Sequence, residues 1–393
     1  MALKILSFLL PLLVFTSCEL LHVIEFFRHG ARTPMVDSDI IKTGAKYKSR
    51  ELTEKGMVEE FALGREFRDR YLPLLSIHNS TKFHEQDLFP SEIFVRSTSR
   101  ERTINTAKSK LMGIYSQDSV CEQRPDIMRA NYEAVHNYAE VNVPIYTENY
   151  HEEDEFLGNG NCYLLQIDWL QRLNNKSFWN TLNHRYDNPR YHDLYKTLEE
   201  YFSISLKENS FVAGYLLSDY LISMKHETGE SPILDEDLLN SFTEAFMDNI
   251  LSETSLKVFV SRLLSPLIPF LQGQECLLPR SKAILISTHD FHLHHILKTV
   301  SSPQPIPFSS RITFELHSDP ARVSLLKDGK PTDLNACGSP TCSLEEFIAY
   351  LEDKLLSPEE IKKYCKLRDG EEPISKNLDI PGVFLEYLES IKE

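Results

Sequence analysis

The sequence of 393 residues is short of positive charge, since 42 lysine and arginine residues stand against 58 aspartate and glutamate residues, a formal net charge of −16 at pH 7. A chain this acidic is not expected to bind nucleic acid or an anionic membrane surface. It would also repel an anionic substrate at long range, so any phosphate site must depend on a local cluster of arginines. Apolar residues make up 41% of the chain, enough for one large or two ordinary domains.

Long apolar runs are also scarce. Ile5–Phe15 is apolar but too short to span a bilayer, and we see no later run of spanning length. Lys4 precedes this run and Thr16-Ser17-Cys18 supplies small residues after it, which predicts a signal peptide over residues 1–18, cleaved before Glu19. Lipid modification of Cys18 is the alternative, although the residues before it make a poor lipobox. We therefore expect a secreted protein without a stable membrane anchor.

Seven cysteines become six once the predicted signal peptide is removed. An even number in a secreted chain predicts three disulfides, and six cysteines allow fifteen pairings. Two sequons, which begin at Asn79 and Asn175, are candidate glycosylation sites. The six cysteines are Cys121, Cys162, Cys276, Cys337, Cys342 and Cys365.

Arginines surround a histidine at the end of the first predicted strand. The apolar run Leu20–Phe27 is typical of a buried strand, and Arg28-His29-Gly30-Ala31-Arg32-Thr33-Pro34 follows it as a turn. Guanidinium groups match the oxygens of a phosphate, and an imidazole between them can attack phosphorus while they neutralise charge. Gly30 would let the backbone approach the ligand. The alternative is a basic turn in which His29 is only hydrogen-bonded.

The second predicted strand, Glu92–Val95, also ends in an arginine, Arg96. A turn rich in hydroxyl groups follows, and then a predicted helix over Ile104–Tyr115, whose N-terminus favours anions. We expect Arg96 to reach the pocket of the first motif, because ligands bind at the carboxyl ends of strands in open α/β sheets. Arg100 and Arg102, farther along the turn, are expected to be solvated or paired with surface carboxylates.

A third strand, Ala283–Ser287, leads into Thr288-His289-Asp290. A protonated Asp290 carboxyl can give the proton that a departing alcohol needs, and a nearby phosphate raises the pKa of that carboxyl. A protonated His289 would add a positive donor to the phosphate. These two residues supply the half of a phosphate-transfer site that the first motif lacks.

A metal site is the alternative for this stretch, since Asp290, His292 and His295 could share one face of a helix. The sequence contains no Cys-x-x-Cys or His-Glu-x-x-His pattern to support a metal. We therefore expect no metal, and expect His294 and His295 to be surface or packing residues.

The pattern of elements predicts an α/β core interrupted by helices. Strands followed by polar turns occur in residues 19–119 and 276–393, whereas residues 120–275 show long helical patterns and predict a mainly helical insertion that caps the sheet. The hydroxyl of Thr53 precedes the first helical pattern, which predicts Thr53 as the N-cap of that helix. Arg311–His317 alternates apolar and polar residues as a half-covered strand does.

These strand ends together resemble the signature of the histidine acid phosphatases, a branch of the histidine phosphatases. The resemblance covers nearly the whole mature chain and includes Leu52-Thr53-x-x-Gly56, Leu63-Gly64 and Arg70-Tyr71. It implies an α/β fold with a mixed central sheet, helices on both faces and a smaller helical domain. It also implies a secreted or lysosomal-type acid phosphatase that hydrolyses small phosphate monoesters and needs no cofactor or metal.

Carried over to this sequence, the resemblance makes His29 the nucleophile that forms a phosphohistidine and Asp290 the proton donor. His292 departs from the family, which often has a hydroxyl or an amide at that position. Ala31 does not decide the substrate, because acid phosphatases often carry Asp there and some phytases carry Ala. The residues implied to bind the phosphoryl group are Arg28, Arg32, Arg96 and His289.

The resemblance further implies the disulfides Cys162–Cys365 and Cys337–Cys342, and we expect Cys121 to pair with Cys276. A phytase of the same family is the nearest alternative function, which the acidic run Glu152-Glu153-Asp154-Glu155 disfavours. A catalytically silent phosphate-ligand binder is an alternative from another class. Besides the substrate, a second copy of the chain in a homodimer is a partner that we consider.

Overall fold

A computed structural model describes the chain over residues 19–41, 48–77, 92–115, 143–147, 162–185, 189–206, 211–230, 236–273, 281–366 and 380–391. Several sequence predictions lie outside these residues. They are the signal peptide, the sequon at Asn79, the acidic run Glu152–Glu155 and the pairing of Cys121 with Cys276.

The central sheet is mixed, as predicted, and its strands follow the order β3-β2-β4-β1-β5-β6-β7, with β8 paired to β6. Strands β3, β2, β4 and β1 run parallel, and β5 joins β1 in the antiparallel sense. The strands are β1 (Leu20–Arg28), β2 (Ile93–Ser97), β3 (Ile145–Tyr146), β4 (Ala283–Thr288), β5 (Arg311–His317), β6 (Arg322–Lys327), β7 (Lys330–Pro331) and β8 (Thr341–Ser343).

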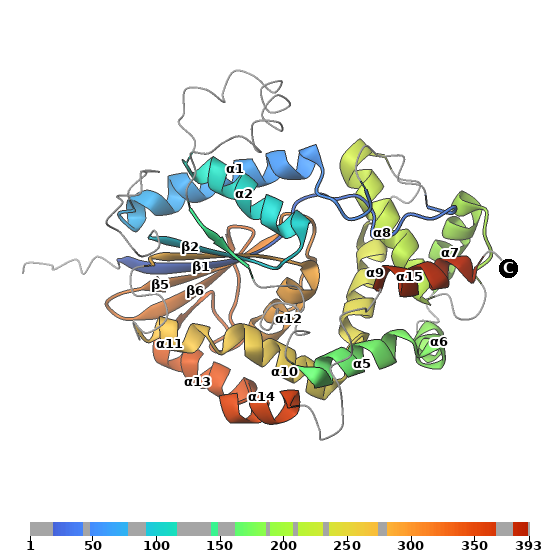
Figure 1. Cartoon of the computed structure of the whole chain (residues 1–393). Helices are drawn as coiled ribbons and strands as arrows, with labels where there is room; N and C mark the ends of the chain where they lie inside the picture. Colours follow the sequence, from blue (N-terminus) through green and yellow to red (C-terminus); the bar gives the residue numbers. More distant parts are fainter. Residues whose placement is uncertain are drawn as a thin grey trace, which may run out of the picture.

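Helices cover both faces of this sheet, as predicted (Figure 1). Helices α1 and α2 lie over one face, α10 to α14 lie on the other, and α6 to α9 gather with α15 at one end. The helices are α1 (Glu54–Leu74), α2 (Glu101–Tyr115), α5 (Tyr163–Leu173), α6 (Lys176–Arg185), α7 (Pro189–Phe202), α8 (Phe211–Thr228), α9 (Glu236–Asn249), α10 (Glu253–Leu264), α11 (Leu267–Leu271), α12 (Asp290–Val300), α13 (Leu344–Lys354), α14 (Pro358–Cys365) and α15 (Ile380–Glu389).

The helical insertion predicted over residues 120–275 corresponds in its described parts to helices α5 to α11 and the short strand β3. Helices α10 and α11 run beneath the sheet, and α15, from the end of the chain, lies beside α8 (Figure 1). The stretch Glu253–Leu271 meets the length and hydropathy criteria of a membrane span, contrary to our expectation of no such run, with a mean hydropathy of 1.3. More than half of it is buried inside the protein, which is common for a core helix, so it is weak evidence for a span.

Helices α1 and α2 cross closely because two glycines meet at the crossing. A Cβ atom on Gly64 would lie 2.1 Å from the carbonyl oxygen of Lys110, and one on Gly113 would lie 2.0 Å from that of Phe61. Only glycine therefore fits at the crossing, which holds α1 and α2 against the sheet and over the motif that follows β1.

Thr53 caps α1 as predicted, since its hydroxyl accepts a hydrogen bond from the Gly56 N–H at 3.2 Å.

Charged groups are buried between this helix pair and the sheet. The Lys110 ammonium lies 2.6 Å from the Glu25 carboxylate, and both side chains are at most 2% exposed. Glu60 on α1 is fully buried, and neither of its carboxyl oxygens has a hydrogen-bond partner in the described part of the chain. Burial raises the pKa of Glu60 to about 7, although the Lys110 charge opposes this rise. One ammonium thus lies among two buried carboxyl groups, and burial favours the protonated form of Glu60.

Strand β5 has the predicted bounds, but it is not half-covered. Thr313 and Glu315, on the polar side of its alternation, are buried as well. Thr313 donates to Glu25 at 3.0 Å, and Glu315 accepts from the Tyr71 hydroxyl at 2.8 Å. The alternation was misleading because β1 and α1 bring polar partners to that face, so hydrogen-bonded polar side chains replace an exposed surface.

Two disulfides are present among the described residues, and both have the pairing that the resemblance implied. Cys162–Cys365 joins the start of α5 to the end of α14, and Cys337–Cys342 closes a short loop before α13. The first links two segments 203 residues apart, which ties the helical region to the end of the chain.

Candidate active site

The first and third motifs lie side by side because β1 and β4 are parallel neighbours. Arg28 is level with Thr288 in the register, and the His29 N–H donates to the Thr288 carbonyl at 3.0 Å. His289 and Asp290 then begin α12, with His289 as its N-cap. The imidazole rings of His29 and His289 lie 5.5 Å apart, and both side chains are buried. The structure therefore brings together the two motifs that the sequence separates by 260 residues.

His29 has a neutral imidazole with a defined tautomer. Its Nδ1 lies 2.9 Å from the carbonyl oxygen of Gly30, which can only accept, so Nδ1 carries the proton and Nε2 keeps its lone pair. Burial, followed by the positive charges of Arg102, Arg28 and Arg32, holds the pKa of His29 well below its ordinary value. The imidazole therefore has a nucleophilic nitrogen available even in acid.

Both arginines of the first motif are paired with carboxylates. Arg28 Nη2 lies 2.7 Å from Asp290 Oδ2, and its Nη1 donates to the Ile306 carbonyl at 2.7 Å. Arg32 donates to both oxygens of Asp219 on α8, at 2.7 and 3.2 Å. Asp290 and Asp219 thus lie where the oxygens of a bound anion would meet these guanidinium groups. Arg32 binds Asp219 through two of its nitrogens, and this bidentate arrangement also suits phosphate.

Phe308 covers the two arginines on one side. Its ring centroid lies 4.2 Å from Arg28 Cζ and 5.6 Å from Arg32 Cζ, within the range of a cation–π contact. The same ring lies 5.8 Å from the His29 ring, and the next residue, Ser309, donates its N–H to the His29 carbonyl at 3.2 Å. The segment before β5 therefore holds His29 and both guanidinium groups in place.

Arg102 is an arginine of the second motif that contacts His289. Its Nη2 lies 3.2 Å from His289 Nδ1, and its Nε is buried without a hydrogen-bond partner among the described residues. Burial and the nearby Arg32 hold the pKa of Arg102 well below its ordinary value, a sign that positive charge gathers here without enough anionic partners. The expectation that Arg102 is solvated or paired with surface carboxylates is therefore wrong.

Arg96 lies within β2 and not in the turn after it, because the strand continues to Ser97. Its register partner in β4 is Ile286, which in turn is level with Phe26 in β1, two residues before Arg28. The turn and the first residues of α2 therefore carry Arg102 to the sheet edge, whereas Arg96 stays lower in the sheet. Phosphate binding by Arg96 stays a prediction.

His289 is neutral in this arrangement. An arginine N–H only donates, so Nδ1 of His289 accepts from Arg102, and its Nε2–H faces the Thr98 hydroxyl at 3.0 Å. Burial, then the charge of Arg102, lowers the pKa of His289 well below its ordinary value. The positive donor that we expected from a protonated His289 is supplied here by Arg102.

Asp290 is ionised beside Arg28 and Arg32. Burial acts to raise its pKa, but the charges of Arg28 and Arg32 outweigh it and hold the pKa below the ordinary value. The Phe291 N–H also donates to Oδ1 at 2.8 Å. Proton donation by Asp290 would therefore require its pKa to rise after a ligand binds.

Asp219 and Phe308 were missed in the sequence. Asp219 is the one charged residue between Phe211 and Met224, in a helix that is otherwise apolar there, and such an isolated buried carboxylate signals a specific partner. Phe308 follows three prolines, at positions 303, 305 and 307, and carries no comparable signal. Gly30 differs from expectation too, because its Cα faces the α1 backbone: an added Cβ would lie 2.5 Å from the Gly56 carbonyl oxygen.

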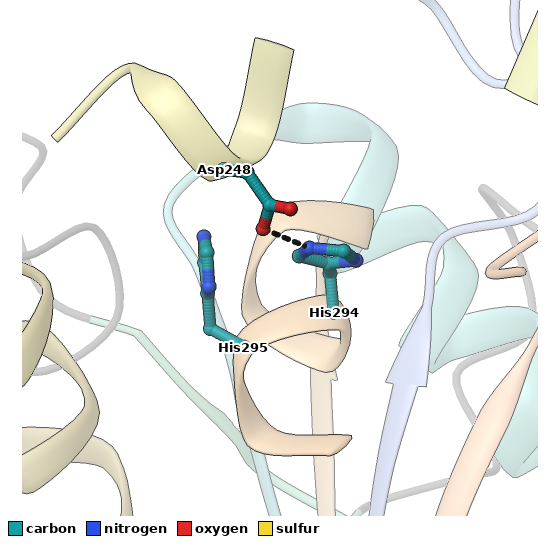
Figure 2. Close-up of side chains that lie close together, drawn as sticks. All are labelled: Asp248, His294 and His295. Atoms are coloured by element: carbon teal, nitrogen blue, oxygen red, sulfur yellow. Dashed lines mark hydrogen bonds and ion pairs between the residues drawn. The ribbon is translucent and has the colours of Figure 1, made fainter. Parts of the chain in front are cut away.

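The remaining predicted residues lie apart from this site. His294 and His295 are buried packing residues and not surface ones. Among the described residues, the group with the spacing of metal ligands is Asp248, His294 and His295, and not the set around Asp290 (Figure 2). Asn175 is exposed at the start of α6, where its side chain accepts from the Phe178 N–H at 2.9 Å, and its glycosylation stays a prediction.

Comparison with known proteins gives one family and one fold. Residues 19–330 match the family described as "Histidine phosphatase superfamily (branch 2)". Bovine lysosomal acid phosphatase is 31% identical over 110 residues, 26% of this chain and 22% of that enzyme. Human prostatic acid phosphatase is 31% identical over 113 residues, 28% of this chain and 27% of that enzyme. The matched segments thus span about a quarter of these relatives.

Solved structures extend the similarity to most of the chain. The phytase from Citrobacter braakii aligns with a TM-score of 0.62 at 15% identity, over 89% of this chain and 100% of that one. A multiple inositol polyphosphate phosphatase from Bifidobacterium longum aligns with a TM-score of 0.55 at 10% identity, over 87% of this chain and 94% of that one. At such identities these similarities establish the fold alone.

Proposed function

Because the chain belongs to branch 2 of the histidine phosphatase superfamily, we propose that it is a secreted or lysosomal-type acid phosphatase that hydrolyses phosphate monoesters through a phosphohistidine. The observation that carries the proposal is the buried neutral imidazole of His29, which is held by its Nδ1 bond to the Gly30 carbonyl and lies within electrostatic reach of Arg28, Arg32 and Arg102. No step requires a metal or a cofactor.

In the first step, His29 Nε2 attacks the phosphorus atom and the alcohol leaves. The Nδ1–H bond to the Gly30 carbonyl supports this role, because it orients the ring and stabilises the positive charge that the imidazole gains. The three guanidinium groups surround the developing negative charge on the phosphoryl oxygens. Water then attacks the phosphohistidine and releases phosphate.

Phosphate binding would exchange carboxylate partners for phosphate oxygens. Arg28 and Arg32 now bind Asp290 and Asp219, and the Nε–H groups of Arg28 and Arg102 are buried without partners among the described residues. A phosphate supplies oxygens for all of these donors, and a buried donor without a partner costs about 1–3 kcal/mol. We assign the third arginine to Arg102, with Arg96 as the alternative from the sequence.

The same exchange would turn Asp290 into an acid. Phosphate draws Arg28 away from Asp290 and adds negative charge nearby, and both effects raise the pKa of the carboxyl group. Asp290 can then take a proton from an acidic solution and give it to the leaving alcohol. His289 would help to hold the phosphate, whose charge favours protonation of the imidazole.

Phytate hydrolysis is the alternative within the family. The fold is shared with phytases, so it does not discriminate between the two substrates. A catalytically silent binder is less favoured, because it has no need for both His29 and Asp290. Export is supported by the two disulfides and by relatives named as lysosomal enzymes.

The test is acid-quench trapping with a ³²P-labelled aryl phosphate at pH 5, with His29→Ala beside the wild type. His192→Ala is the matched control, because its imidazole is 85% exposed. We expect label on the wild type and the control and none on His29→Ala, with an adduct that survives base. If the wild type hydrolyses the ester but carries no label that His29→Ala removes, the phosphohistidine is refuted. If the wild type does not hydrolyse the ester, the result favours the catalytically silent binder. Phytate and aryl phosphates compared at equal concentration then decide the substrate class.

A further inference from the structure

We propose that Asp248, His294 and His295 form a binding site for a divalent transition-metal ion of the zinc class, separate from the phosphate site. Asp248 lies in the last turn of α9, and the two histidines lie on consecutive positions of α12. One ligand atom from each residue lies within 4.8 Å of the others, and Figure 2 shows the three side chains converging between the helices.

The two imidazoles are suited to bind a metal through their lone pairs. Both side chains are buried, with His294 3% and His295 1% exposed. His295 Nε2 lies 3.2 Å from the Met247 carbonyl and must donate to it, so Nδ1 keeps its lone pair and has no partner among the described residues. A histidine ligand held by an N–H bond to a backbone carbonyl is the usual arrangement at metal sites.

Asp248, the third proposed ligand, is hydrogen-bonded to His294, which is the contact expected between two metal ligands when no ion lies between them. His294 Nε2 lies 2.7 Å from Asp248 Oδ1. An ion that binds here breaks this hydrogen bond: the Nε2 proton leaves, Nδ1 takes up a proton from solvent, and Nε2 and Oδ1 both turn to the metal. Ligand atoms about 2.0–2.1 Å from one tetrahedral ion lie about 3.3–3.4 Å apart, so Nε2 of His294 and Oδ1 of Asp248 must separate slightly to admit the ion.

The surroundings attract a cation. The Lys298 ammonium lies 2.7 Å from the same Oδ1, so a positive charge is already held at this point. Asp248 is near the C-terminus of α9, whose dipole favours cations. Glu244, one turn earlier, interacts electrostatically with His294. Because the Lys298 side chain is 41% exposed, it can turn into solvent when a divalent ion takes its place.

Two imidazoles with one carboxylate favour Zn²⁺ and similar ions over Mg²⁺ or Ca²⁺, which prefer oxygen ligands. The ion would join α9 to α12, and α12 begins with Asp290. The expected effect is therefore on stability, because the bound ion holds together two helices from distant parts of the chain. Phosphoryl transfer does not use this ion.

The test uses the full chain, stripped with EDTA and then titrated with Zn²⁺ by calorimetry, with Tm and the visible spectrum of the Co²⁺ form as further readouts. We expect one equivalent of Zn²⁺, a higher Tm, and the spectrum of tetrahedral Co²⁺ bound to nitrogen and oxygen. Asp248→Asn and His294→Gln should weaken binding by at least about 10-fold. Asp248→Asn tests the site without a change in the buried core, because this side chain is 35% exposed.

Lys298→Met is the decisive variant, because removal of the competing ammonium should tighten Zn²⁺ binding, and Lys298→Arg should not. His192→Ala, far from the proposed ligands in sequence and exposed, should bind as the wild type does. The proposal is overturned if the wild type takes up no Zn²⁺, if Asp248→Asn binds it equally well, or if Lys298→Met leaves the affinity unchanged.

Discussion

Replacement of Glu60 by glutamine should make the fold less sensitive to alkaline pH. Glu60 is fully buried, and burial raises its pKa from 4.5 to about 7. The folded protein therefore binds the Glu60 proton more tightly than the unfolded chain does. The stability that comes from the bound Glu60 proton is therefore fully present below pH 4.5 and is lost as the pH rises through 7.

The magnitude follows from the size of the shift. A shift of about 2.5 pKa units corresponds to about 3 kcal/mol in the free energy of unfolding, at 1.36 kcal/mol per unit. Between pH 5 and pH 8 the wild type should lose about 2–3 kcal/mol through this group. Glu60→Gln keeps the shape of the protonated carboxyl and cannot ionise, so it should not show this loss.

The assay is urea unfolding of the wild type and of Glu60→Gln at several pH values from 5 to 8, with the difference between the two free energies as the readout. Glu66→Gln is the control, because Glu66 lies on the same helix with a side chain that is 60% exposed. The difference between Glu60→Gln and the wild type should grow with pH. A difference that stays constant from pH 5 to pH 8 would refute the reasoning that Glu60 is neutral in the folded protein.

Three further predictions concern the site and its scaffold. Arg102→Ala should lower kcat/KM for an aryl phosphate by about 100-fold or more, and Arg96→Ala should lower it by less, because Arg102 contacts His289. A larger loss for Arg96→Ala than for Arg102→Ala would make Arg96 the third phosphate-binding arginine. Asp290→Asn should slow esters of poorly acidic alcohols more than p-nitrophenyl phosphate, whose leaving group needs little protonation, and an equal loss on both would contradict proton donation. Gly64→Ala should lower Tm and reduce the free energy of unfolding by about 1–3 kcal/mol, because its Cβ would overlap the α2 backbone near Lys110. An unchanged Tm would contradict the close crossing of α1 and α2.

The sequence alone was sufficient for the strands and their polar ends. Apolar runs followed by glycine, proline or hydroxyl residues predicted β1, β2 and β4 to within about two residues, because buried strands need apolar side chains and turns need particular backbone conformations. The motifs around His29 and His289 were found in the same way, since chemistry at the edge of a sheet requires polar residues directly after a strand. The resemblance of these motifs to one family then implied the mixed sheet and both described disulfides.

The tertiary structure decided which side chains share one site. The sequence favoured Arg96 over Arg102 for the pocket, and only the register of β2 and the direction of α2 bring Arg102 to His289. Asp219 reaches Arg32 because helix α8 packs beside the sheet edge, which no local pattern predicts. The side chains of Glu25, Glu60 and Lys110 are buried for the same reason: burial depends on what packs against a residue, and that is a property of contacts between distant segments.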